Sequence, residues 1–145
     1  MKTFEDVAKV FKTLAQVYIR GGSSKWASSK PPYKTGNLFR RIGQLDEKKM
    51  VRKKVDSNAT KISVQASNIQ IGLNFAPQGA EYGKWVEWGN GTGVGAGQPR
   101  PFAKTAANDP LLKRAIDAAV QDQVIQPILL GVKVALDRQL AKYKN

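Results

Sequence analysis

One stretch of the sequence has the spacing of a nucleotide-binding loop. Residues 91–96 read GTGVGA, which matches the glycine fingerprint of dinucleotide-binding proteins with alanine at the last position. That fingerprint works because a helix starts within it and its N-terminus receives the pyrophosphate. Here Gly97, Pro99 and Pro101 follow instead, and no Gly-Lys-Ser/Thr sequence closes a phosphate loop. The stretch therefore predicts a glycine-rich loop over residues 89–98 and no nucleotide cofactor.

The residue types that most often perform catalysis are absent. The chain has no histidine and no cysteine, which removes the commonest general base, the thiol nucleophile and the usual ligands of zinc. Glu81 and Glu87 are the carboxylates beside the aromatic segment, and the sequence places no second acid across a cleft, as a glycosidase pair requires. We therefore expect no enzymatic activity, no catalytic residues, no metal and no cofactor.

The chain is strongly basic, and the charge is uneven. Its 145 residues carry 24 Lys and Arg against 11 Asp and Glu, a net charge of +13. Residues 1–54 hold 14 of these basic residues against four acidic ones. Such a field attracts polyanions, including nucleic acid. The densest basic cluster is Lys48, Lys49, Arg52, Lys53 and Lys54. It predicts either a surface that faces DNA through phosphate contacts or a solvated edge strand protected against aggregation.

Three large aromatic residues follow at a spacing of three. Tyr82, Trp85 and Trp88 could stack bases, as aromatic residues do in proteins that bind single strands. Such grooves interleave aromatic with basic residues, and here only Lys84 stands close by. The same spacing suits a short helix, so packing on the core or contact with another protein is the favoured interpretation.

The first third of the chain predicts two helices joined by an arm. Apolar residues recur at helical spacing over residues 3–19, where Thr3 and Asp6 form a capping box. Residues 21–32 are rich in Ser, Lys, Gly and Pro and have no periodicity. We expect this segment to be a mobile arm or a long loop, which in an assembly protein could become ordered against a neighbouring subunit. A short helix to about residue 43 then buries Leu38 and Ile42.

The rest of the chain predicts a small sheet and C-terminal helices. Apolar and polar residues alternate over residues 61–67 and 69–75, Ser67-Asn68 lies where a tight hairpin turn would fall, and residues 50–55 are strand-like but heavily charged. This pattern indicates two or three antiparallel strands with one buried face. A helix begins at Pro110 behind an Asn or Asp cap, and Pro127 is expected to break or kink it before a last helix. The sequence therefore predicts an α+β fold of a single domain over residues 1–145, with C-terminal helices packed on the sheet. No apolar run spans a membrane and no signal core is present, so we expect synthesis in the cytoplasm.

Two segments carry a resemblance to a known family. Residues 33–38 read YKTGNL; Tyr82 and the sequence WVEWGNG at 85–91 come later, and PRPF at 99–102 follows a glycine-rich spacer. This order is similar to that of the minor structural proteins at the head–tail junction of long-tailed bacteriophages. That family has a T-G-N-L element, then an aromatic-Val-Glu-aromatic-Gly-x-Gly element, then a Pro-Phe that opens a helix. Trp85 and Trp88 depart from the Tyr and Phe that are commoner there.

The resemblance implies a non-catalytic α+β protein that forms a ring, of six or twelve subunits, between the capsid portal and the tail tube. Its partners would be copies of itself, neighbouring neck, adaptor and tail-tube proteins, and the DNA that passes through the channel, with no membrane. Its location would be the virion. The residues implied at subunit or partner contacts are Trp26, Tyr82, Trp85, Glu87, Trp88, Gly89, Gly91, Arg100 and Phe102. The alternative is a basic nucleic-acid-binding protein, which would bind DNA without any partner ring.

Overall fold

The first helix runs through the middle of the fold. A computed structural model describes residues 1–53, 58–89 and 97–144, and in it α1 spans Phe4–Gly21. Thr3 accepts a hydrogen bond from the Asp6 N–H (3.2 Å), and the Asp6 carboxylate accepts one from the Thr3 N–H (2.9 Å), which is the predicted capping box. The apolar stripe of α1, which includes Val7 and Phe11, is completely buried.

The sheet has three antiparallel strands in the order β1-β3-β2. These are β1 (Val51–Arg52), β2 (Lys61–Ala66) and β3 (Ile69–Asn74). Ala66 pairs with Ile69 across a two-residue turn, in which Ser67 has a φ of 58°. The predicted hairpin is confirmed. The first strand is shorter than the expected 50–55, whose last two residues lie outside the described part of the chain.

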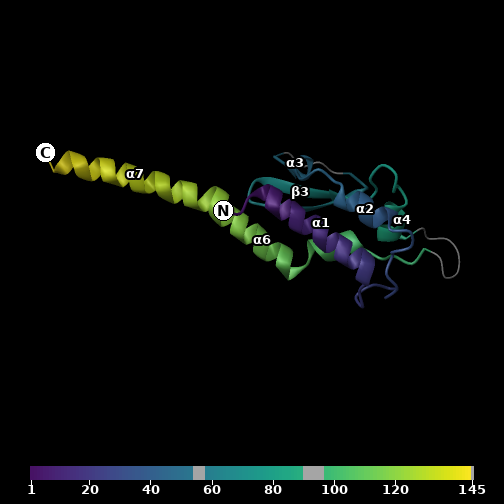
Figure 1. The fold of residues 1–145 in the computed structure, drawn as a ribbon. Coiled ribbons are helices and arrows are strands. Elements are labelled where there is room, and N and C mark those ends of the chain that lie inside the picture. Colours follow the sequence, from purple (N-terminus) through teal and green to yellow (C-terminus); the bar gives the residue numbers. More distant parts are fainter. Residues whose placement is uncertain (54–57, 90–96, 145) are drawn as a thin grey trace.

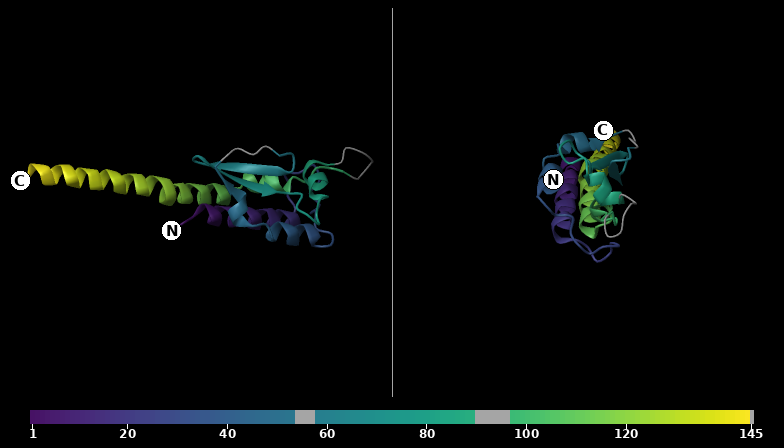
Figure 2. Two further views of the ribbon diagram at one scale, coloured as in Figure 1. Left: turned by 90° about the horizontal axis from the view of Figure 1, so that it is seen from above. Right: turned by 90° about the vertical axis from the view of Figure 1, so that its right-hand side faces the viewer.

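Helices cover one face of the sheet and leave the other face open. Besides α1, these are α5 (Phe102–Ala107) and α6 (Pro110–Val120), which contact β2 (Figures 1 and 2). Alternation along β3 sends Ile71 and Leu73 into this core. The α+β class is therefore confirmed. No helix in the described residues is both long and apolar enough to cross a bilayer.

Short helices complete the described body of the fold. They are α2 (Asn37–Gly43), α3 (Glu47–Met50) and α4 (Gly83–Trp88). As predicted, Leu38 and Ile42 of α2 are buried. The nearly buried Lys12 of α1 holds this region together. Its ammonium group donates to the carbonyl oxygens of Gly43 (3.0 Å) and Leu45 (2.7 Å) and pairs with Glu47 at 2.8 Å.

A break at Pro127, one of the two predicted outcomes, does not occur. A π-helical turn, η1 (Gln121–Ile125), joins α6 to α7 (Gln126–Tyr143), so the helix continues. A proline ring clashes with the carbonyl four residues earlier, which here is that of Gln123 within the wider π turn. The N-terminus also fixes this turn, because the Lys2 N–H donates to the Asp122 carboxylate at 2.7 Å.

The last helix does not pack on the sheet, which corrects the predicted packing of the C-terminal helices. Of the C-terminal helices in the described residues, α5 and α6 contact the sheet. No residue of α7 is buried, and the helix projects from the body as an arm (Figures 1 and 2). The helix continues from α6 through η1 beyond the end of the body, so it extends past the sheet and does not run alongside it (Figures 1 and 2).

Candidate functional site

The two segments that carry the family resemblance lie next to each other in space. The side-chain amide of Asn37, which precedes Leu38 in α2, donates to the carbonyl oxygen of Gly79. Gly83, the first residue of α4, packs directly on the backbone of the segment after β3. A Cβ atom added to Gly83 would lie 1.7 Å from the Phe75 carbonyl oxygen and 3.0 Å from a methyl carbon of Leu38. This glycine therefore allows the close approach of the two segments.

Glu87 joins the aromatic segment to the helix that follows it. Its two carboxylate oxygens accept the N–H groups of Ala103 (2.8 Å) and Lys104 (2.9 Å), in the first turn of α5. No side chain of Pro101 caps this helix, so Glu87 satisfies its free N–H groups from a distant position. Burial raises the pKa of Glu87 to about 7. The two hydrogen bonds from backbone N–H groups favour the ionised form and lower the pKa, but burial has the larger effect.

Aromatic residues line a hollow at the end of the molecule opposite α7. Tyr82 and Trp85 are 37% and 56% exposed, and Trp88 is 52% exposed. Trp88 is nevertheless held in place, because its N–H donates to the Ala59 carbonyl (3.2 Å). The hollow has a volume of about 430 Å³. Its lining includes Tyr33, Lys34, Tyr82, Trp85, Gln98 and Arg100. This end of the body therefore presents aromatic and basic side chains together.

Three of the expected contact residues are interior residues in this fold. Trp26 is only 7% exposed and donates from its indole N–H to the Thr105 hydroxyl (3.0 Å), which fixes residues 21–32 to α5. Glu87 and Phe102 are fully buried. These three side chains support the surface from inside and do not reach a partner as the chain is folded here.

The remaining contact candidates lie near the same end of the body. Gly89 has a φ of 77°, and a Cβ there would lie 2.2 Å from the Gly97 carbonyl oxygen, so glycine is required. Arg100 lines the aromatic hollow. Gly91 and most of the predicted glycine-rich loop, residues 90–96, lie outside the described residues.

The basic cluster spans a helix and a strand. Lys48 and Lys49 are exposed on α3, Arg52 is exposed on β1, and Lys53 follows it, while Lys54 lies outside the described residues. The Arg52 guanidinium donates to the Lys49 carbonyl at 3.2 Å, which fixes its direction.

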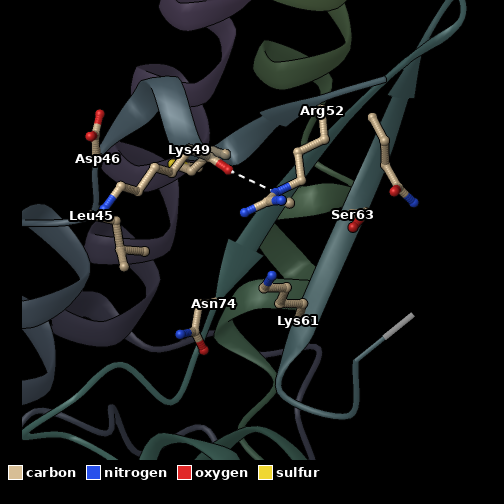
Figure 3. A pocket seen from close by; sticks show the side chains of 10 residues that line it. Leu45, Asp46, Lys49, Arg52, Lys61, Ser63 and Asn74 are labelled. Atoms are coloured by element: carbon tan, nitrogen blue, oxygen red, sulfur yellow. Dashed lines mark hydrogen bonds between the residues drawn. The ribbon is translucent and has the colours of Figure 1, made fainter. Parts of the chain in front are cut away.

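A hollow of about 230 Å³ lies beside this cluster on the open face of the sheet, and its lining includes the apolar Leu45 and Met50 and the acidic Asp46. Arg52 and Lys61 extend over it, and Ser63 and Asn74 lie at its sides (Figure 3). Sequence reasoning missed the contributions of β2 and β3, although their alternation could have placed these polar residues on one face. The hollow thus combines basic and neutral hydrogen-bonding groups with one carboxylate and with apolar side chains.

Neither family models, curated proteins nor solved structures gave a match to this chain. Within residues 1–53, 58–89 and 97–144, no three acidic side chains gather where they could hold a metal ion. The geometry described above leaves three candidate sites: the aromatic hollow, the basic open face of the sheet and the exposed α7.

Proposed function

We propose that this chain is a structural subunit of the head–tail junction of a long-tailed bacteriophage. In this role it forms a ring with its own copies, between the portal complex and the tail tube, and it performs no catalysis. Its location is the virion. The observation that carries the proposal is the aromatic hollow, because it is framed by the two segments that resemble this family.

The geometry around the hollow supports this proposal. Gly83 and Glu87 hold the aromatic segment against α2 and α5, while Tyr82 and Trp85 remain exposed beside Arg100. Exposed Trp, Tyr and Arg side chains on a rigid support are the residues that most often dominate binding between proteins. The residues that resemble the family thus either support this surface from inside or are exposed on it. An assembly subunit needs both a rigid support and an exposed contact surface.

Analysis of purified particles tests the proposal. Particles from a lysate that contains this chain are purified on a density gradient, and an antibody against the chain is applied to the fractions. We expect a 15.9 kDa band that stays with intact particles, at six or twelve copies by quantitative mass spectrometry. The portal protein serves as the copy-number standard. If the chain remains at the top of the gradient while the portal protein sediments, it is not a constituent of the particle.

The basic open face of the sheet favours DNA binding as a second candidate function. Substitution of Arg52 by Ala removes the oriented guanidinium beside the hollow on the open face of the sheet. If this group contacts one phosphate, the slope of log affinity against log salt should fall by about one unit. Fluorescence anisotropy of a labelled duplex over a salt series measures that slope.

The control for this experiment is Lys113→Ala, which removes an exposed positive charge of α6 away from the hollow. Equal effects of the two substitutions would assign binding to the net charge of the protein. The absence of binding at low salt would reject this candidate function.

A further inference from the structure

The exposed helix α7 carries a continuous apolar stripe. Its members are Ile125, the last residue of η1, and Ile128, Leu129, Val132, Leu136, Leu140 and Tyr143 of α7. Leu130 and Val134 of α7 are also exposed and lie outside this stripe. The side chains of the stripe are between 40% and 86% exposed. At 3.6 residues per turn they fall within an arc of roughly 120°. A stripe of this width normally faces a core, and the described body of this chain leaves none for it.

The spacing of this stripe reads the same in both directions along the helix. Ile125, Ile128, Val132, Leu136, Leu140 and Tyr143 are separated by steps of 3, 4, 4, 4 and 3 residues. An antiparallel copy centred at residue 134 therefore aligns these six residues with one another, whereas Leu129 of the stripe lies level with Gln139 of the second copy. Val132 meets Leu136 of the second copy, and Ile128 meets Leu140 of the second copy.

The charges beside the stripe fit the same arrangement. Lys133 and Asp137 lie one turn apart on a single flank of the stripe. A two-fold axis at residue 134 brings that flank of one helix against the same flank of the other. Lys133 lies roughly 80° from the centre of the stripe, at the edge of the contact, and its long side chain extends toward the side on which Asp137 of the second copy lies, roughly 120° from that centre; symmetry repeats this arrangement. Arg138 lies on the opposite side of the helix and stays in water.

We propose that two copies of this chain associate through α7 as an antiparallel, two-fold helix pair. Seven side chains at roughly 100 Å² each remove on the order of 700 Å² per copy from water, close to the about 800 Å² typical of stable complexes. The bodies lie at opposite ends of the pair, and their aromatic hollows face outward, because each hollow is at the end of the body away from α7. This inference goes beyond the proposed function, since it describes the free chain.

Analytical ultracentrifugation of three full-length proteins tests the association. The wild-type chain should be a dimer at micromolar concentration. Leu136→Asp places a charge in the interface twice per dimer and should weaken dimerisation at least about a hundred-fold. The matched control is Val134→Asp, on the opposite side of the same helix and 44% exposed, which should leave the dimer intact. Circular dichroism verifies that the bodies of both variants stay folded.

Disulfide trapping tests the direction of the pair, because the chain has no cysteine of its own. Val132→Cys protein is mixed with Leu136→Cys protein and oxidised. The antiparallel pair predicts mixed disulfides in excess of either homodimer, read by mass spectrometry. A monomeric wild type, equal weakening by both aspartate substitutions, or an excess of the two homodimers would each overturn the proposal. Incorporation of the Leu136→Asp variant into particles is measured in a separate experiment. A failure of the association through α7 can therefore be distinguished from a failure of the proposed function.

Discussion

Substitution of Gly83 by Ala is expected to destabilise the protein by about 3 kcal/mol or more. The added Cβ would lie 1.7 Å from the Phe75 carbonyl oxygen, and both atoms belong to backbone segments that cannot rotate away as a flexible side chain would. The clash is relieved when α4 moves away from the end of β3. Urea denaturation followed by circular dichroism measures the loss in the free energy of unfolding.

Gly21→Ala is the matched control for this prediction. Gly21 is the last residue of α1, and an added Cβ there has no neighbour within 4 Å. Because alanine favours helix more than glycine does, the control should unfold at an equal or slightly higher urea concentration. A Gly83→Ala protein as stable as Gly21→Ala would show that α4 does not rest on the Phe75 backbone.

The ionisation of Glu87 is expected to make the protein less stable as the pH rises. Glu87 has a pKa of about 7 in the folded chain and an ordinary value of 4.5. The folded state thus binds the proton more tightly than the unfolded state does. The stabilisation from this proton is complete below pH 4.5 and is lost as the pH rises through 7. The shift corresponds to about 3 kcal/mol.

Urea denaturation at pH 5 and pH 8 measures this dependence in the wild type and in Glu87→Gln. The wild-type free energy of unfolding should fall by about 3 kcal/mol more than that of the variant between the two pH values. Glu87→Gln should also be less stable than the wild type at pH 5, because an amide NH2 cannot accept a hydrogen bond from a backbone N–H, whereas the hydroxyl oxygen of the protonated carboxyl still can. The exposed Glu81 has a lowered pKa, and Glu81→Gln should follow the wild-type profile over this range. Parallel profiles for wild type and Glu87→Gln would contradict the assignment.

The sequence predicted the local features of the fold well. The capping box at Thr3, the two-residue turn at Ser67 and the start of α6 at Pro110 follow from short-range chemistry, and the structure has each of them. The alternation along β3 predicted which of its faces is buried. These features depend on residues close together in the chain, so the pattern alone is sufficient.

The long-range features could not be predicted. Glu87 stands between Val86 and Trp88 like a surface carboxylate, and only the return of the chain at α5 shows that it caps that helix. Trp26 lies in a polar segment, yet one hydrogen bond and burial fix it to the body. For α7 the sequence predicted a helix, but a local pattern does not state which surface, if any, that helix packs on.

The π turn between α6 and α7 sets the rotational phase of the arm. A regular α-helix over the same residues would turn the apolar stripe to another side of the axis, because a π turn rotates less per residue. The direction in which α7 presents its stripe relative to the body is thus determined by the number of residues in this π turn. A one-residue insertion or deletion at this place would re-aim the arm without changing any side chain that it presents.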